Sequence, residues 1–349
     1  MRYLTIFCAA AILSLILALV VKSLARRWKI MDDPASAPER KSQKKPIPLL
    51  GGWAIIATVI IGGLGVYFGT SWWVGASFGG GKLLWILGGA VIIALGGFLD
   101  DKYNLKPRIS ILAPLLAVVC ALVGGVGVQF ISNPAGGIIA FAPWAGICLT
   151  IVWLLAMIYA TKFMDGLDGL VTGISGIGGL VIAGLCLITP FFQPDVALLA
   201  LLFAGACAGF LVLNFHPAKI YLGESGSLFC GFILGVLAII SGSKIATTLL
   251  VLGIPLLDLL WVVARRVFKY HKSPFKGDRL HLPFQLLDAG LSHKQTVLLL
   301  YVWSLIFGLS ALFMRGWQKV AAIALLILML AILFVWIARR QKRAAKSAV

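Results

Sequence analysis

The stretch LLWILGGAVIIALGGFLDDKYNLKPR, residues 83–108, joins a long apolar run to a polar turn that begins with two adjacent aspartates. An Asp near the centre of a membrane-spanning helix costs about 2.5–3.5 kcal/mol. We therefore expect Asp100 and Asp101 at the end of this helix, where it meets the membrane surface. Their position predicts a helix that spans a bilayer and delivers two carboxylates to one side of it.

The rest of the chain repeats this apolar pattern. Of its 349 residues, 61% are hydrophobic and 12% are charged, and the mean hydropathy of +1.03 lies well outside the range of soluble domains. A helix needs roughly 20 apolar residues to cross a hydrocarbon core of about 30 Å. We therefore expect an all-α integral membrane protein, a polytopic bundle of about eleven transmembrane helices. The runs cover residues 3–25, 48–69, 83–99, 109–131, 138–160, 170–189, 196–213, 226–241, 245–264, 296–314 and 319–338.

The domain organisation is simple. No internal repeat and no sign of a second domain interrupts the runs, so residues 1–349 are expected to form one polytopic domain. The longest connection, residues 264–296, and the basic tail, residues 339–349, are expected in the cytoplasm. The first run continues into ARRWK without a small-residue cleavage site, which predicts an uncleaved helix rather than a signal peptide.

The formal net charge of +18 is explained by topology. With the N-terminus outside, the threaded runs place 25 of the 30 Lys and Arg on one side, and the positive-inside rule makes that side cytoplasmic. The C-terminus then also lies in the cytoplasm. The basic excess favours contact with anionic lipids. No basic-aromatic module accompanies it, so nucleic-acid binding is not expected.

Acidic residues gather in short connections on the same side. Clustered carboxylates repel one another unless a cation lies among them, whereas a single acid at a helix end is commonly solvated or capping. Magnesium binds oxygen ligands and is usually held by one or two carboxylates together with the phosphates of a substrate. The pattern therefore predicts a Mg²⁺-dependent enzyme that acts on a diphosphate. The six acids are Asp100, Asp101, Asp165, Asp168, Glu224 and Asp278.

Basic residues near these acids are expected to offset phosphate charge, although membrane orientation alone also explains each of them. They are Lys102, Lys106, Arg108, Lys162, Lys219 and Arg279. His216, His271 and His293 have no spacing that indicates a metal site, and we expect them to be solvated loop residues. Asp258 lies inside the ninth run, where a functional role and a structural pairing are equally expected.

Six motifs in this order resemble the polyprenyl-phosphate N-acetylhexosamine-1-phosphate transferases over nearly the whole chain. The opening motif is more similar to the WecA-type branch than to the MraY branch, which uses phospho-MurNAc-pentapeptide. The resemblance implies transfer of a sugar phosphate, with GlcNAc-1-phosphate expected, from a UDP-sugar to undecaprenyl phosphate, with release of UMP. The motifs are ERKSQKKPIPLLGG (39–52), GGFLDDKYNLKPR (96–108), FMDGLDGL (163–170), NFHPAKIYLGESGSLF (214–229), PLLDLLWVVARR (255–266) and DRLHL with LLDAGLS (278–292).

The resemblance also implies a setting and a cofactor. It places the protein in the bacterial inner membrane with a cytoplasmic active face, where it would begin the synthesis of a cell-envelope glycan. It implies Mg²⁺ as the cofactor, with Mn²⁺ as a substitute. The partners would be the UDP-N-acetylhexosamine and the lipid phosphate, and a homodimer is left open.

The resemblance assigns roles to particular residues. The catalytic set it implies is Asp100, Asp101, Asp165, Asp168 and His281. Its metal ligands are Glu224, Asp165 and Asp100. Its substrate-binding set is Asn214, Lys219, Lys162, Arg108, Asp278 and Arg279.

This sequence departs from the family pattern at several of the same positions. Lys162 stands where the family usually has Asn, and Glu224 stands where it has Asp. Two further histidines and an arginine of the family's histidine motif are replaced by Pro283, Phe284 and Gln285. These changes leave open a relative that has lost its activity and serves as a scaffold.

A cation-coupled transporter is the alternative from another functional class. Transporter sites lie near the bilayer midplane, and only Asp258 fits that pattern. Glycines in or beside the runs are expected to allow close helix packing rather than to bind phosphate. They are Gly51, Gly52, Gly88, Gly89, Gly96 and Gly97.

Overall fold

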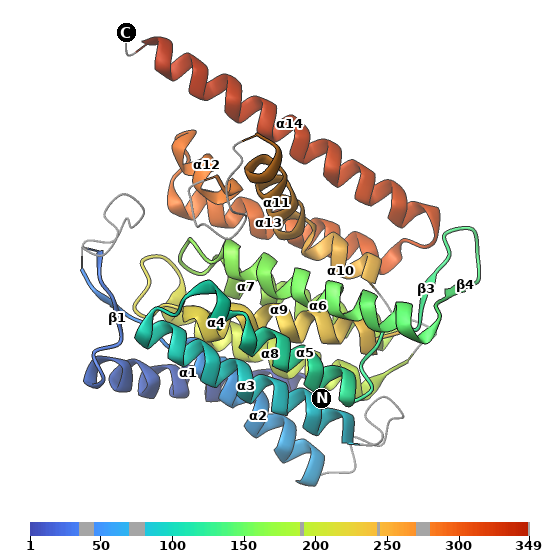
Figure 1. Cartoon of the computed structure of the whole chain (residues 1–349). Coiled ribbons are helices and arrows are strands. Elements are labelled where there is room, and N and C mark those ends of the chain that lie inside the picture. Colours follow the sequence, from blue (N-terminus) through green and yellow to red (C-terminus); the bar gives the residue numbers. More distant parts are fainter. Residues whose placement is uncertain (35–44, 70–80, 189–191, 243–244, 270–279, 348–349) are drawn as a thin grey trace.

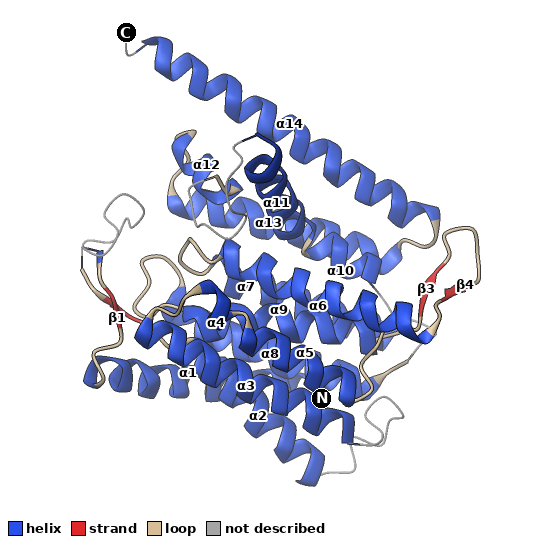
Figure 2. Cartoon of the chain, in the orientation of Figure 1, coloured by secondary structure: helices blue, strands red, loops and turns tan. Residues whose placement is uncertain are grey.

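The protein forms a bundle of helices with two short β-hairpins (Figures 1 and 2). The computed structural model describes residues 1–34, 45–69, 81–188, 192–242, 245–269 and 280–347. Within this part of the chain, eight helices are long and apolar enough to span a membrane, and one bent helix pair passes the same test. The prediction of a polytopic α-helical bundle is confirmed. The eight helices are α1 (Arg2–Arg27), α3 (Lys82–Tyr103), α6 (Pro143–Met164), α7 (Leu170–Ile188), α8 (Pro194–Asn214), α9 (Gly223–Ile240), α13 (His293–Phe313) and α14 (Trp317–Ser347).

Shorter elements complete the described structure. The bent pair consists of α10 and α11, and the two hairpins are antiparallel. The helices are α2 (Gly52–Gly69), α4 (Pro107–Ser110), α5 (Leu112–Val123), α10 (Ile245–Val251), α11 (Gly253–Ala264) and α12 (Leu282–Asp288). The strands are β1 (Met31–Asp32), β2 (Ile47–Pro48), β3 (Phe130–Ser132) and β4 (Ile138–Ala140).

The centre of the bundle is built on α8 and α9, which are buried along most of their length. Phe203 of α8 meets Phe229 of α9 edge to face, and both side chains are fully buried. The outer helices α1 and α14 instead expose large apolar side chains such as Leu19 and Leu328. Exposed apolar surface on this scale is favourable in lipid and costly in water. The outer surface of the bundle is therefore apolar, as expected for a protein that is surrounded by lipid.

The fourth and fifth predicted spans are wrong in their bounds. Residues 130–132 and 138–140 pair as β3 and β4 instead of extending the neighbouring helices. Helix α5 ends at Val123 because glycines follow, and Gly125 takes a left-handed conformation with a φ of +77°. The turn between the strands contains Gly136 and Gly137, both with positive φ.

The ninth predicted span is also wrong as a single straight helix. Helices α10 and α11 meet at a bend of 80° after Val251. Pro255 follows in the first turn of α11, where its missing N–H causes no loss of an internal hydrogen bond. The break therefore starts a new helix and turns α11 toward α6, with which it packs.

The predicted long connection and basic tail contain helix. Within residues 264–296 the chain forms a π-helical turn at Arg265–Lys269, then α12, and α13 begins at His293. Ser292 caps α13 in a capping box with Gln295. Helix α14 continues to Ser347, through most of the predicted tail.

The two ends of the bundle differ. In Figure 1, β1, α4 and α12 lie at one end, and the β3–β4 hairpin lies at the other. The connections that carry the predicted acids follow α3, α6 and α8, and they share the end of α4 and α12 (Figure 1). The side of the membrane on which this end lies stays a prediction from the positive-inside rule.

Candidate active site

Helices α3 and α9 approach closely at one glycine. A Cβ on Gly97 would lie 2.3 Å from the backbone of Ser225, so only glycine allows this contact. Asp101 lies one helical turn beyond Gly97, and its Oδ1 accepts a hydrogen bond of 3.0 Å from the backbone N–H of Glu224. Gly223, with a φ of +74°, makes the turn into α9 beside this carboxylate. The close approach thus joins two predicted acids that are far apart in sequence.

Asp100 organises the turn that follows α3. Asn104 ends the helix in a left-handed conformation, and the Asp100 Oδ1 accepts a hydrogen bond of 3.0 Å from the backbone N–H of Leu105. The Ser110 hydroxyl donates to the Asp100 Oδ2 at 2.6 Å. The carboxylate is thereby held in place from two sides.

Lys162 connects these acids. It lies in the last turn of α6, and the neighbouring Thr161 hydroxyl is 2.8 Å from the backbone carbonyl oxygen of Ser227 in α9. The Lys162 Nζ is 2.8 Å from the Glu224 Oε2 and 3.7 Å from the Asp100 Oδ2. Side chains from α3, α6 and α9 therefore converge on one ion-paired cluster.

Asp165 follows α6 directly and ends that helix. Its side chain reaches the surface but has protein atoms on most sides. This desolvation, followed by repulsion from the carboxylates of Glu224 and Asp168, raises the pKa of Asp165 to about 8. The position of Asp165 thus adds a further carboxyl to the cluster.

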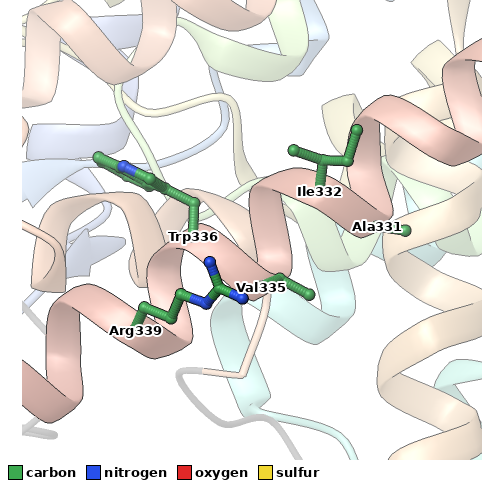
Figure 3. Close-up of a pocket in the computed structure, with 5 residues that line it drawn as sticks. All are labelled: Ala331, Ile332, Val335, Trp336 and Arg339. Carbon is green, nitrogen blue, oxygen red and sulfur yellow. The ribbon is translucent and has the colours of Figure 1, made fainter.

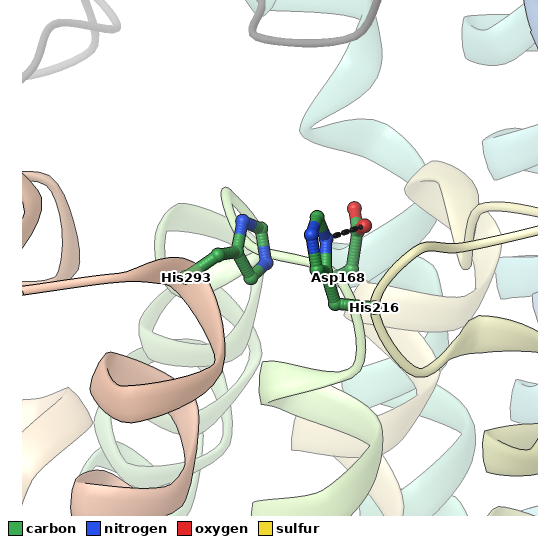
Figure 4. A group of neighbouring side chains, drawn as sticks. All are labelled: Asp168, His216 and His293. Atoms are coloured by element: carbon green, nitrogen blue, oxygen red, sulfur yellow. Dashed lines mark hydrogen bonds and ion pairs between the residues drawn. The ribbon is translucent and has the colours of Figure 1, made fainter.

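Asp168 pairs with a histidine from the connection between α8 and α9. Its Oδ2 lies 2.7 Å from the His216 Nδ1 and accepts a hydrogen bond of 3.1 Å from the backbone N–H of Ala218. The His293 ring, at the start of α13, stacks on the His216 ring with centroids 4.1 Å apart (Figure 4). His216 lies in a connection as expected, but His293 begins α13, and both imidazoles are only partly exposed because they stack on each other.

The three side chains have the composition of a metal site, and their donor atoms lie within 4.8 Å of one another. However, the two imidazole planes differ by only 16°. Because the lone pair of an imidazole nitrogen lies in the ring plane, the lone pairs of these two stacked rings lie in nearly parallel planes, which does not favour their meeting at one ion. In the arrangement of Figure 4, Asp168 orients His216, and His293 covers its ring.

His281 has a buried carboxylate partner. Its Nδ1 lies 2.8 Å from the Oδ2 of Asp258 in α11, whose Oδ1 accepts a hydrogen bond of 2.8 Å from the backbone N–H of Leu282. The Phe163 ring stacks on the imidazole at 5.7 Å. The pairing leaves the His281 Nε2 buried and without a hydrogen bond among the described residues. Asp258 therefore fixes the orientation of His281.

The replaced histidine motif has a structural role. Pro283 opens α12, in the first turn, where proline is favoured. The Phe284 ring packs against Gly166, where a Cβ would lie 2.5 Å from the ring. Helix α12 is therefore seated on the turn between Asp165 and Asp168.

The remaining predicted residues differ in position. The Asn214 amide is buried: it accepts a hydrogen bond from the Thr172 hydroxyl and donates one to the backbone carbonyl of Ile220. Asn214 therefore shapes the connection before α9 from within. Arg108 and Lys219 are exposed. Asp278 and Arg279 lie outside the described residues.

A shallow pocket on α14 lies apart from this cluster. It is lined by apolar side chains and one arginine, all from α14 (Figure 3). Helix α14 packs against α10, α11 and α12, and carries none of the predicted acids. The pocket residues are Ala331, Ile332, Val335, Trp336 and Arg339.

The carboxylate cluster has the oxygen donors of a hard divalent cation, but in the described residues no three of its carboxylates place oxygens within 4.8 Å of one another. The Asp101 Oδ2 is buried and has no hydrogen-bond partner among the described residues. A buried carboxylate oxygen without a partner is costly unless a cation or donor completes it. Asp100, Asp101, Asp165 and Glu224 supply only oxygen ligands, which is the donor set that Mg²⁺ prefers.

Four residues of this region were missed or misjudged from sequence. Ser110, which contacts both Asp100 and Lys162, carries no sequence signal because it lies in α4, ten residues after Asp100. His216 and His293 come together only through the packing of α13 near the connection between α8 and α9. Asp258 had a signal, a carboxylate inside an apolar run, but no indication of its partner.

Comparisons with known proteins identify relatives of this chain. Residues 83–242 match the model of glycosyl transferase family 4, and this range includes Asp100, Lys162 and Glu224. The chain is 31% identical to a probable undecaprenyl-phosphate N-acetylglucosaminyl 1-phosphate transferase of Bacillus subtilis, over 95% of this chain and 91% of that protein.

Two further relatives have names that describe two different transferases. A decaprenyl-phosphate N-acetylglucosaminephosphotransferase of Mycolicibacterium smegmatis is 30% identical over 81% of this chain and 75% of its own length. A phospho-N-acetylmuramoyl-pentapeptide-transferase of Halalkalibacterium halodurans is 28% identical over 88% of this chain and 95% of its own length. The similarity to the first two relatives agrees with the predicted WecA-type branch. The chain is a multi-pass membrane protein that belongs to glycosyl transferase family 4, the family of the polyprenyl-phosphate sugar-1-phosphate transferases.

Proposed function

We propose that the protein transfers GlcNAc-1-phosphate from UDP-GlcNAc to undecaprenyl phosphate and releases UMP. The observation that carries this proposal is the convergence of Asp100, Asp101 and Glu224 with Lys162 at one end of the bundle. The donor and acceptor follow the names of the relatives. The reaction would take place on the cytoplasmic face of the bacterial inner membrane and begin the synthesis of an envelope glycan.

The proposed cofactor is Mg²⁺, with Mn²⁺ as a substitute, held by Glu224 together with Asp100 and Asp165. A divalent cation at this position would neutralise diphosphate charge and polarise the phosphorus under attack. The Asp101 Oδ2, which is buried and has no hydrogen-bond partner among the described residues, would be available as a further ligand.

The residues of the chain then mainly supply position and charge, as is usual for phosphoryl transfer. An oxygen of the lipid phosphate bonds to the β-phosphorus of the UDP-sugar, and the bond from that phosphorus to the bridging oxygen breaks. The bridging oxygen leaves with UMP. Lys162 would pair with phosphate oxygens as charge develops on them, and the buried His281 Nε2, which has no hydrogen-bond partner among the described residues, would bind a phosphate that reaches it.

A carboxylate base is of secondary importance in this reaction. The second pKa of a phosphate monoester lies near 6, so the acceptor phosphate is already largely ionised at neutral pH. Asp100 is held by the Leu105 N–H and the Ser110 hydroxyl, which suits a fixed ligand or orienting group better than a group that exchanges protons.

The test is a panel of UDP-linked sugars assayed with undecaprenyl phosphate and purified protein. We expect a chloroform-extractable product and stoichiometric UMP with UDP-GlcNAc, dependent on added Mg²⁺. A product formed only with UDP-MurNAc-pentapeptide would instead assign the activity of the Halalkalibacterium relative. A cooperative thermal transition would show that the purified protein is folded. If such protein gave no product with any donor, the proposal would be wrong, and transport or a scaffold role would replace it.

A further inference from the structure

The Lys162 ammonium occupies a position that suits a bound cation. Its Nζ lies 2.8 Å from the Glu224 Oε2, 3.7 Å from the Asp100 Oδ2 and 3.3 Å from the Ser110 Oγ. These three groups come from α9, α3 and α4. The side chain of Lys162 is only 19% exposed, so the ammonium is enclosed by the oxygens that contact it.

The charges around this position are unbalanced without a cation. Asp101 joins the same cluster by accepting a hydrogen bond from the Glu224 backbone N–H, and Asp165 follows Lys162 by three residues. Among the described residues, Lys162 is the basic side chain that pairs with Asp100 and Glu224. The nearby Lys106 is exposed to solvent. Lys162 therefore supplies the positive charge inside the cluster.

The two partners in the shortest contact are also two positions where this sequence departs from the family pattern. A glutamate reaches farther than an aspartate by one methylene, and a lysine provides an ammonium where an asparagine provides an amide. The 2.8 Å contact between Glu224 and Lys162 shows that the two departures fit each other.

We propose that Lys162 is a built-in counter-ion that holds the carboxylates together without a metal and competes with the divalent cation for Glu224 and Asp100. This inference rests on the proposed function for its biological meaning, but its test does not require turnover. When a divalent cation takes this position, the ammonium is free to pair with the phosphate oxygens of the donor. Lys162 would thus make tight metal binding depend on the arrival of the diphosphate.

A permanent structural ion pair is the alternative reading of the same contacts. In that case, loss of the lysine would leave Glu224 unpaired and destabilise the protein equally with or without metal. If Lys162 competes with the cation, its loss instead improves metal binding, and the metal restores the lost stability. The two readings differ in the sign of the change in metal affinity.

The test is Mn²⁺ binding to purified full-length protein, measured from the electron paramagnetic resonance signal of free Mn²⁺. We expect Lys162→Gln to bind Mn²⁺ roughly tenfold more tightly than the wild type, because a charge within a few ångströms of the site is removed. Lys162→Arg keeps the charge and is expected to retain the weak affinity. Lys106→Gln removes an exposed charge and serves as the matched control, with a change of less than about twofold.

The thermal transition gives a second readout of the same variants. Lys162→Gln is expected to unfold at a lower temperature than the wild type in EDTA and to recover when Mn²⁺ is added. An unchanged or weaker Mn²⁺ affinity in Lys162→Gln, relative to Lys106→Gln, would overturn the proposal. Absence of Mn²⁺ binding in every variant would overturn it as well.

A measurement on the wild type covers the case in which Lys162→Gln does not fold. Acetylation of Lys162 by acetic anhydride, followed by mass spectrometry, is expected to increase severalfold when Mn²⁺ releases the ammonium, while acetylation of Lys106 stays constant. Unchanged labelling of Lys162 under saturating Mn²⁺ would contradict the proposal. Failure of the donor panel with these results intact would reject the proposed reaction and leave the counter-ion role standing.

Discussion

At the scale of single residues, Asp165 sets an expected pH dependence. Its folded pKa of about 8 lies above the value of about 3.9 for an unperturbed Asp, so the folded state holds an extra proton between these limits. The stability that this proton provides is lost progressively as the pH rises from about 4 to about 8. In EDTA, the apparent melting temperature should fall between about pH 5 and pH 8 and level off above that, and it should fall less in Asp165→Asn. An equal decline in both proteins would show that another group is responsible.

Asp258 is expected to affect turnover indirectly, because it orients His281. Asp258→Ala leaves the His281 Nδ1 and the Leu282 N–H without their acceptor, a loss of about 1–3 kcal/mol in stability for each unpaired buried group. We expect kcat to fall about as far as in His281→Ala, and the double variant to be no slower than His281→Ala. Asp258→Asn, which keeps one acceptor oxygen, should recover part of the activity.

Full additivity of the two losses in that comparison would contradict a positioning role. Protein levels in the membrane fraction control for misfolding, since a variant that fails to accumulate reports stability rather than positioning.

At the scale of elements, the contact between α3 and α9 is the most sensitive to substitution. Gly97→Ala places a Cβ about 2.3 Å from Ser225, which overpacks the helix contact and should cost about 1–3 kcal/mol. Since Asp101 and Glu224 meet next to this contact, the rate of UMP release should fall even in the fraction of the variant that is still folded. Gly88→Ala is the matched control from the same helix, because a Cβ there meets nothing within 4 Å. Equal effects of the two substitutions would show that the close approach is not needed.

The glycines also illustrate what sequence can predict about the elements. The predicted packing role is confirmed where a Cβ would clash with a neighbouring helix, and it is wrong for Gly88; the confirmed positions are Gly51, Gly52, Gly89, Gly96 and Gly97. Apolar runs predicted the helices because a run of about 20 apolar residues is typical of a membrane-spanning helix. The bend after Val251 and the β3–β4 hairpin were not predicted, because an apolar composition does not distinguish a straight helix from a bent helix pair or from short paired strands.

At the scale of the whole molecule, the acidic motifs predicted that separate turns would meet, and Asp100, Asp101 and Glu224 do lie together. The sequence did not predict which side chains of the site contact each other. The contacts of Lys162 with Glu224 and of Asp258 with His281 join residues far apart in the chain, and only the packing of α3, α6, α9 and α11 decides them. Residue types indicate the chemistry of a site more readily than they indicate its pairs.

In the whole molecule, the turns that follow α3 and α6 and the start of α9 are expected to form one catalytic cluster. The direct measurement is UMP release from UDP-GlcNAc by membranes containing Asp100→Ala, Asp101→Ala, Asp165→Ala or Glu224→Ala at equal protein level. Each variant is expected to lose about 100-fold or more in rate, as when a group that stabilises transition-state charge is removed. Near-normal turnover in all four variants would show that these carboxylates do not form the catalytic site.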